Sequence, residues 1–264
     1  MVKSGQSISR ALDIIESLSK KKEGYGVTEL SNIVGLHKST TYRILISLQD
    51  RGYVRKNSDS GKYHLTMRIV QLSSAFLDQV ELRTESHPYL KALAMETKQT
   101  VHLGILQGID ITYVEKVMAY NNIRTYAQIG MSIPAYRTGM GKALIAALPP
   151  NQREELISRI EFKPLLPNTL TDPDKFRKAL TQVSENGYAI DDIENEAGIR
   201  CIASVVRDYT GKAIAAVSIS GSAEDFEGDA LALKIDLLKN TTSGISEALG
   251  YFEDDSLRGN QQVY

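Results

Sequence analysis

Apolar residues in the first quarter of the chain recur at the three- and four-residue spacing of helices, in three separate runs. The recurring positions are Ile8, Ala11, Leu12, Ile15 and Leu18, then Leu30, Ile33 and Val34, then Ile44, Leu45 and Leu48. Gly35 separates the second run from the third, where a helix C-terminus favours a residue that can take a positive φ. The pattern predicts three helices, with a tight turn between the second and the third.

Two short strand-like runs follow the third helix, at residues 52–56 and 62–65. The intervening residues 57–61 are Asn, Ser, Asp, Ser and Gly, all of which favour turns. Three helices followed by a hairpin form a winged helix-turn-helix, whose recognition helix lies in the major groove of DNA. We therefore predict a DNA-binding domain over residues 1–66. A small helical domain with an ordinary solvated rim is the alternative.

Polar and basic residues gather at the start of the third helix and on the hairpin, where contacts to phosphates and base edges need hydrogen-bond donors. The candidate DNA-binding residues are Thr28, Lys38, Ser39, Thr40, Thr41, Tyr42, Arg43, Arg55, Lys56 and Lys62. Among them we expect Arg43 to contact bases and Lys38 to contact phosphate.

The distribution of charge supports the prediction of a DNA-binding domain. Residues 1–65 contain 11 Lys and Arg against 6 Asp and Glu, whereas the other 199 residues contain 20 against 26. A net charge of −1 for the whole chain therefore conceals a basic first quarter and an acidic remainder. Because binding to DNA depends on neutralising phosphates, the basic quarter is the segment suited to that role.

The rest of the chain alternates between helical and strand-like patterns. Residues 67–82 have a helical period and are predicted to connect the two domains; a helix that only caps the second domain is the alternative. Strands are predicted at 101–106, 111–117, 123–127, 201–207 and 213–220, and helices at 139–148, 172–186 and 223–249. We predict an α+β domain on an antiparallel sheet over residues 83–250, followed by a disordered tail at 251–264.

Length and composition set broad limits on the protein. A chain of 264 residues with 42% hydrophobic and 24% charged residues suits two globular domains. No apolar run approaches the ~20 residues of a membrane span, so no membrane partner is expected. The first residues lack the apolar segment of a signal peptide, so no leader is expected, and the single cysteine excludes an internal disulfide. A bacterial cytoplasm is the expected location.

One group of residues in the second domain suits the binding of a small hydroxylated carboxylate. Gly139 opens a helix in a glycine-rich run, and the unpaired N–H groups of such a start attract anions. Ser218 and Ser220 face one side of a strand, Cys201 begins its partner strand, and Asp191 opens an acidic loop. The alternatives are an ordinary glycine loop, serines bonded to the backbone, a buried cysteine and a solvated acidic loop.

The segment from Gly187 to Ala203 resembles the signature of the IclR (isocitrate lyase regulator) family. Leu36-His-Lys-Ser-Thr-Thr-Tyr-Arg43 resembles the DNA-reading helix of that family, and Gly139-Met-Gly-Lys-Ala-Leu-Ile-Ala146 its effector loop. The resemblance covers residues 6–250 and implies a one-component transcription regulator with a winged helix and a GAF-like effector domain, assembled as a dimer or a dimer of dimers. It places the effector site on Gly139, Met140, Asp191, Cys201, Ser218 and Ser220, with Ile133 and Ile199 among its apolar walls.

Within the family, short segments such as Thr100-Val-His-Leu-Gly104 and Leu249-Gly-Tyr251 are similar to the pectin-degradation branch, which senses 2-keto-3-deoxygluconate. The resemblance therefore implies a repressor controlled by a 2-keto sugar acid, whose hydroxyl-bearing end lies at Asp191 because that carboxylate would repel the ligand's own. A family member that senses another 2-keto or aromatic acid is the first alternative. The others are an enzyme with Cys201 as nucleophile, and a DNA-binding protein whose second domain only oligomerises. No cofactor, catalytic residue or metal site is expected.

Overall fold

The computed structural model describes residues 6–77, 81–119 and 126–251. Its contacts divide the chain into two units, Met1–Gln79 and Val80–Tyr264, which are described separately below. The predicted strand at 123–127 lies largely outside the described residues, and its last two, Tyr126 and Ala127, are not in a strand. The predicted disordered tail also lies outside them, apart from Tyr251.

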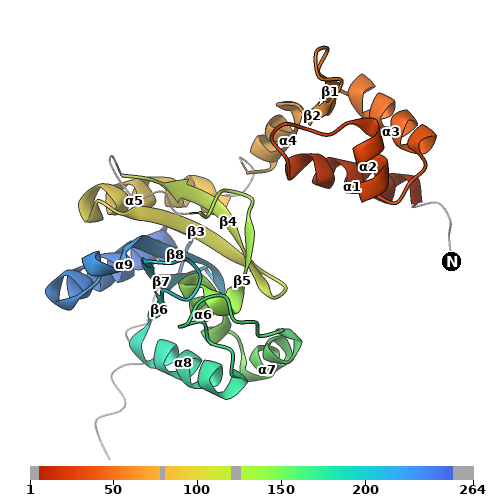
Figure 1. Cartoon of the computed structure of the whole chain (residues 1–264). Helices are drawn as coiled ribbons and strands as arrows, with labels where there is room; N and C mark the ends of the chain where they lie inside the picture. The colour runs from red at the N-terminus through yellow and green to blue at the C-terminus, as the bar shows by residue number, and fades with distance from the viewer. Residues whose placement is uncertain (1–5, 78–80, 120–125, 252–264) are drawn as a thin grey trace, which may run out of the picture. The chain divides into compact units, whose positions relative to one another are not determined.

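The first unit is a winged helix-turn-helix, as predicted. Its elements are α1 (Gln6–Ser19), α2 (Val27–Ile33), α3 (Lys38–Asp50), β1 (Val54–Lys56), β2 (Tyr63–Leu65) and α4 (Arg68–Leu77), shown in Figure 1. Gly35 takes a φ of 64° in the turn between α2 and α3. The two strands pair antiparallel, with Val54 opposite Leu65. The buried core consists of Ile14, Leu18, Leu30, Leu45, Leu48, Val54 and Tyr63.

The buried face of α1 matches the predicted one only in part, since Leu18 is buried and Ile15 packs against the core. Ile14 is fully buried, whereas Ile8 and Leu12 are 67% and 52% exposed. Two overlapping stripes run along this helix at helical spacing, one through Ile8 and Leu12 and the other through Ile14 and Leu18. Periodicity alone does not distinguish such stripes, because only packing against α2, α3 and β2 selects the one that is buried.

The second unit is an α+β domain built on one antiparallel sheet, as predicted. Its helices are α5 (Glu81–Thr97), α6 (Gly139–Ala146), α7 (Pro150–Arg159), α8 (Pro173–Asn186) and α9 (Gly228–Ala248). Its strands are β3 (Thr100–Gln107), β4 (Asp110–Val117), β5 (Ser132–Pro134), β6 (Ala189–Asp192), β7 (Ile199–Arg207) and β8 (Ala213–Ser222). The strand order across the sheet is β5-β4-β3-β8-β7-β6.

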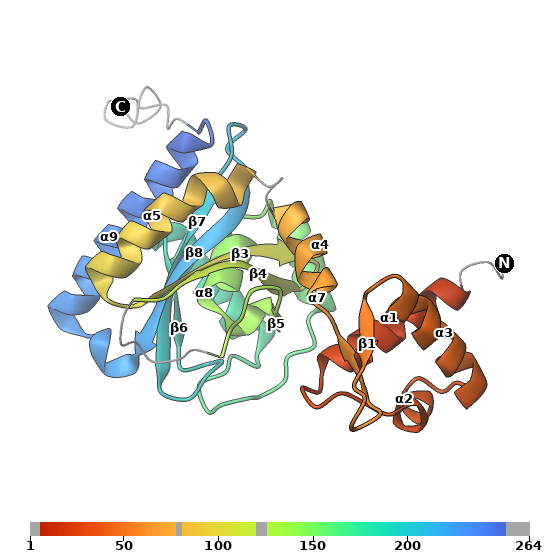
Figure 2. The same cartoon turned by 90° about the horizontal axis from the view of Figure 1, so that it is seen from above.

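Helices cover both faces of this sheet, as Figures 1 and 2 show from two directions. On one face α5 and α9 pack against each other and over apolar strand residues: Val101, Leu103, Ile202, Val217 and Ile219. On the other, which we call the α6 face, α6 lies against the central strands and α8 packs on α6. Strand residues alternate between the two faces, so a register position decides which environment a side chain enters.

Several elements differ from their predicted description, and β5 (Ser132–Pro134) was not predicted. Pro149 and Pro150 follow the end of α6, but Pro150 also begins the unpredicted helix α7, since proline fits the first turn of a helix. Asp191 lies inside strand β6 and is 4% exposed, rather than opening an acidic loop. The predicted connector at 67–82 corresponds to α4 and the first residues of α5, with 78–80 outside the described residues. None of the described helices has the length and apolar character required to cross a bilayer.

Candidate functional site

The start of α3 presents polar side chains to solvent. Lys38, Ser39, Tyr42 and Arg43 are exposed and Thr40 is half-buried. His37 precedes the helix as its N-cap and makes no side-chain capping bond. The exposed side chains at the first turns of α3 are therefore available to a partner outside the domain.

Thr41 does not belong to this exposed set. Its side chain is fully buried, and its hydroxyl donates to the carbonyl oxygen of His37 at 3.3 Å. The residue lies on the same side of α3 as the buried Leu45 and Leu48, one and two turns further along. We correct the predicted DNA-binding set by removing Thr41.

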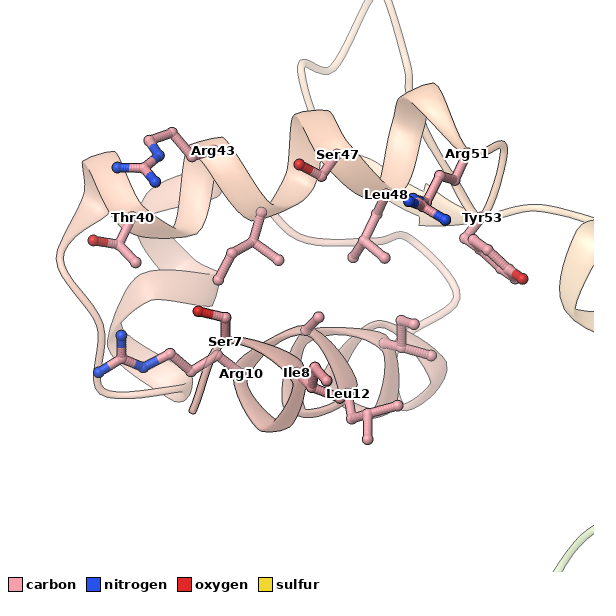
Figure 3. Close-up of a pocket in the computed structure, with 13 residues that line it drawn as sticks. Ser7, Ile8, Arg10, Leu12, Thr40, Arg43, Ser47, Leu48, Arg51 and Tyr53 are labelled. Atoms are coloured by element: carbon pink, nitrogen blue, oxygen red, sulfur yellow. The ribbon is translucent and has the colours of Figure 1, made fainter. Parts of the chain in front are cut away.

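A groove of about 770 Å³ lies between α1 and α3 within the first unit (Figure 3). Thr40 and Arg43 line it from α3, and Ser7 and Arg10 line it from α1. Arg51, which follows α3, lines it as well. Arg10 and Arg51 were not among the predicted residues, because neither belongs to the motif at the start of α3. They add two guanidinium groups to the positive charge around Arg43.

The remaining predicted residues of this unit lie on the wing and on α2. Arg55 and Lys56 are exposed on β1, and Lys62 is half-buried just before β2. The turn between the strands is held by Asn57, whose side-chain oxygen accepts from the backbone N–H groups of residues 59 and 60 at 3.0 and 2.9 Å. Thr28 is exposed near the start of α2.

In the second unit, a row of polar residues crosses three strands of the α6 face. Asp191 on β6 is paired with Cys201 on β7, and Cys201 is paired with Ser220 on β8. Ser218 lies two residues along β8 and shares the face with Ser220. The structure therefore brings together four of the predicted effector residues, which come from three separate strands.

The start of α6 lies against the same part of the sheet. A side chain on Gly139 would place its Cβ 3.3 Å from the Cβ of Ala203 on β7 and 3.6 Å from the backbone nitrogen of Asp191. Thr138 is the N-cap: its hydroxyl accepts from Gly141 N–H at 2.9 Å, and its carbonyl oxygen accepts from the N–H of residue 142. The helix offers no partner to the first two N–H groups, those of Gly139 and Met140, which are therefore available to an anion.

Met140 itself points away from this row. Its sulfur lies 3.1 Å from the position that a Cβ on Gly104 of β3 would occupy, so the side chain packs on β3. The Cγ2 methyl of Ile111 lies 2.9 Å from the same position, and Ile111 is the strand partner of Ile133. Ile133 is thus part of the apolar core around Met140. Ile199 is buried on β7 and shares the face of Cys201, two residues further along.

Asp191 lies in a network that the sequence analysis did not identify. Its Oδ1 accepts from the backbone N–H of Glu194 at 2.8 Å. Burial raises the pKa of Asp191 to about 7, and the nearby Lys142 ammonium opposes that rise. Lys142 and Glu194 are both buried and form an ion pair, while the second carboxylate oxygen of Glu194 has no hydrogen-bond partner among the described residues.

Only one local signal could have indicated this pair. Lys142 follows the two glycines at the start of α6, an unusual position for a charged residue inside an apolar run, but its partner lies 52 residues away in sequence. Glu194 belongs to the acidic segment for which a solvated loop was the alternative to a role in the site. The ion pair attaches this segment to α6, and Thr169 adds a second attachment, because its hydroxyl donates to the carbonyl oxygen of Glu194 at 2.7 Å.

His102 on β3 is a further buried polar residue on the α6 face. It is paired with Ser218, and its Nδ1 lies 3.4 Å from the hydroxyl of Ser220. The Tyr113 ring meets it edge-on, with ring centroids 5.3 Å apart. Burial lowers the pKa of His102 to about 3, and the positive charge of Lys116 acts in the same direction. The imidazole is therefore neutral at neutral pH.

The thiol of Cys201 is not set up as a nucleophile. Burial raises the pKa of Cys201 well above its usual value, and the neighbouring Asp191 carboxylate raises it further. A reactive cysteine needs the opposite environment, with a base or a cation that favours the thiolate. Within the described residues, no group of three His, Cys, Asp or Glu side chains could hold a metal ion.

Comparisons with known proteins agree with both units. A family model described as the bacterial transcriptional regulator IclR C-terminal domain matches residues 74–247, and one described as the IclR helix-turn-helix domain matches residues 7–58. The transcriptional regulators XynR and KdgR of Escherichia coli K12 are each 34% identical to this chain. The alignments cover 93% of the chain and 98% of XynR, and 94% of the chain and 94% of KdgR.

A solved structure shows the same architecture. The crystal structure of IclR from Thermotoga maritima superposes with a TM-score of 0.80 at 30% identity, covering 93% of this chain and 99% of that one.

Proposed function

This chain belongs to the IclR family of bacterial transcriptional regulators, which are not enzymes, and from that premise we propose that it is a repressor controlled by a 2-keto sugar acid of pectin or uronate breakdown. The first unit binds operator DNA, and the second binds the effector. This role accounts for the division of the chain into a basic quarter and an acidic remainder.

The observation that carries the effector proposal is the contact between the start of α6 and the polar row on the sheet. The N–H groups of Gly139 and Met140 receive the carboxylate, since a helix start favours negative charge. Asp191 and Ser220 lie in the row beside it and receive hydroxyl groups of the ligand. A ligand with an anionic end and a hydroxylated chain matches both halves of this arrangement.

The raised pKa of Asp191 refines the orientation that we propose. A carboxyl group with a pKa of about 7 is protonated in part of the molecules at neutral pH. The neutral form donates a hydrogen bond, and it repels the ligand carboxylate less than the ionised form does. Cys201, which lies between Asp191 and Ser220 in the row, contributes a small apolar surface.

For DNA, we propose that α3 enters the major groove with Arg43 on base edges and Lys38 on phosphate. The proposed contact set is Thr28, Lys38, Ser39, Thr40, Tyr42, Arg43, Arg55, Lys56 and Lys62. The protein acts as a dimer or a dimer of dimers, so that two copies of α3 read half-sites about one helical turn apart, ~10 base pairs, or a multiple of that distance. A footprint that lacks two-fold symmetry would contradict this arrangement.

The effector proposal is tested by a thermal-shift screen of the full-length protein against sugar acids, 2-keto acids and aromatic acids. A ligand that binds only the folded state raises the melting temperature in a concentration-dependent way. We expect 2-keto-3-deoxygluconate to give the largest shift and to release operator DNA in an electrophoretic mobility assay. A larger shift with an aromatic acid would replace the proposed effector class, and tighter DNA binding with the effector would replace the repressor role.

A further inference from the structure

His102 and Thr100 are buried polar residues of β3 on the α6 face that neither the predicted site nor the proposed ligand contacts include. We infer that His102, together with Ser220, binds a hydroxyl group on the carbon chain of the effector, so that the site selects hydroxylated 2-keto acids over unsubstituted ones. This inference rests on the proposed function and specifies which group selects the ligand class.

The position of His102 supports the inference first. The row Asp191, Cys201 and Ser220 continues to Thr100 on β3, and His102 lies two residues further along that strand, paired with Ser218. The side chain of His102 is 2% exposed and its Nδ1 lies 3.4 Å from the hydroxyl of Ser220. His102 therefore flanks the row on the β3 side, opposite the edge where Asp191 lies.

The chemistry of the neighbouring residues supports it second. Two ammonium groups lie in this part of the molecule, and both already have oxygen partners. Lys142 is paired with Glu194, and Lys116 donates to the carbonyl oxygen of Ala127 at 2.7 Å. The anionic end of a ligand is therefore matched by the start of α6, while the β3 side of the row is lined by hydroxyl and imidazole groups suited to uncharged polar atoms.

The imidazole has the capacity that a hydroxyl group requires. The Nδ1 of a neutral imidazole donates or accepts according to the tautomer, and the Ser220 hydroxyl beside it can do both, so the pair can satisfy a ligand hydroxyl group that is itself donor and acceptor. The edge-on contact with Tyr113 holds the imidazole ring in one orientation. A site built to hydrogen-bond a hydroxyl group binds an analogue without that group more weakly, because the hydrogen bond to the ligand is lost and nothing replaces it.

The experiment is calorimetric titration of the full-length protein with 2-keto-3-deoxygluconate and with pyruvate, which lacks the hydroxylated chain. Three variants are compared with the wild type: His102→Leu, His102→Asn and His87→Leu. Asn keeps a donor and an acceptor close to the position of Nδ1, and the matched control His87 lies on α5, on the other face of the sheet. Melting temperatures of all variants establish that they are folded.

We expect His102→Leu to weaken binding of the sugar acid by about 10- to 100-fold and to leave the weaker binding of pyruvate as it is in the wild type. His102→Asn should recover a substantial part of that loss, and His87→Leu should bind both acids as the wild type does. Such a result distinguishes recognition of a ligand hydroxyl group by His102 from a purely structural role of this residue. A structural role would weaken the binding of both acids alike.

Two results with His102→Leu would overturn the inference while leaving the proposed function in place: sugar-acid affinity within threefold of the wild type, or an equal loss for both acids. Failure of His102→Asn to recover affinity would do the same. If the wild type binds neither 2-keto-3-deoxygluconate nor pyruvate, or prefers pyruvate, the proposed effector class itself is wrong and the inference falls with it.

Discussion

The two units of this protein present their functional side chains in opposite ways. In the first unit the candidate DNA contacts are mostly exposed and lie close together in sequence on α3 and the wing. In the second unit Asp191, Ser218 and Ser220 are at most 4% exposed and come from two strands, β6 and β8, that are distant in sequence. Exposed residues are free to change without loss of packing, whereas each buried polar residue also helps to hold the domain together.

This difference predicts that mutations in the two units should have different effects on binding and on stability. Substitutions on α3 should alter DNA binding and leave the free energy of unfolding almost unchanged. Substitutions on the α6 face should alter ligand affinity and stability together, in proportions set by burial and charge. The predictions that follow test this contrast, from the largest expected effect to the smallest.

The largest effect is expected at the buried ion pair. Lys142→Met should lower the free energy of unfolding of the second unit by about 3–5 kcal/mol, because it leaves the Glu194 carboxylate buried and unpaired. Arg177→Met is the matched control, since Arg177 pairs with Glu154 on the surface, where solvent screens the pair and it contributes little to stability. Chemical denaturation measures both variants. Equal losses of unfolding free energy in the two variants would show that the burial of an ion pair does not decide how much its removal destabilises the protein.

Removal of a ligand contact should come next. Asp191→Ala and Ser220→Ala should each weaken effector binding by about 1–3 kcal/mol, up to ~100-fold, because a buried ligand hydroxyl group loses its partner. Operator affinity without effector should stay near that of the wild type, since the DNA contacts lie in the other unit. Calorimetry and mobility-shift titration measure the two quantities. Wild-type effector affinity in both variants would place the pocket elsewhere.

On α3, Arg43→Ala should weaken operator binding by about 1–3 kcal/mol and relax specificity at one base pair. Lys38→Ala should weaken binding to operator and random DNA alike and reduce the salt dependence. Both variants should unfold within about 0.5 kcal/mol of the wild type, because both side chains are exposed. Equal losses on operator and random DNA for Arg43→Ala would refute its assignment to bases.

The pH dependence of stability provides the finest test. Asp191, with its pKa raised to about 7, is protonated when folded and ionised when unfolded between about pH 5 and 6. His102, with its pKa lowered to about 3, is neutral when folded and charged when unfolded over the same range. Each state therefore binds one proton at this pair of residues, and their contributions to the slope of stability against pH cancel.

Single substitutions should reveal the separate contributions of Asp191 and His102 to the slope of stability against pH. In Asp191→Asn the remaining His102 makes the unfolded state bind the extra proton, so stability should rise with pH by up to about 1.4 kcal/mol per unit. In His102→Asn the remaining Asp191 makes the folded state bind it, so stability should fall with pH at a similar slope. Denaturant titrations at several pH values, compared with the wild type, measure these slopes. Changes of the same sign in both variants would contradict the opposite pKa shifts.

Much of the first unit could be predicted because its signals are local. The spacing of apolar residues, Gly35 and the turn residues 57–61 placed three helices and a hairpin without any knowledge of distant contacts. In the second unit the glycine-rich start of α6 was local as well, and it was predicted at Gly139. Strand identity was less secure for β6, where two consecutive aspartates obscured a four-residue strand.

By itself, the sequence determined the fold class, the helix-turn-helix, the charge of the first unit and the glycine-rich helix start at Gly139, since each depends on residues within a few turns or strand positions. Only the tertiary structure decided which stripe of α1 is buried, that Thr41 faces the core, and that Lys142 meets Glu194. It alone brought His102 to Ser220, 118 residues away. The physical reason is that burial and strand register arise from the packing of distant segments, and a side chain acquires its environment only when that packing forms.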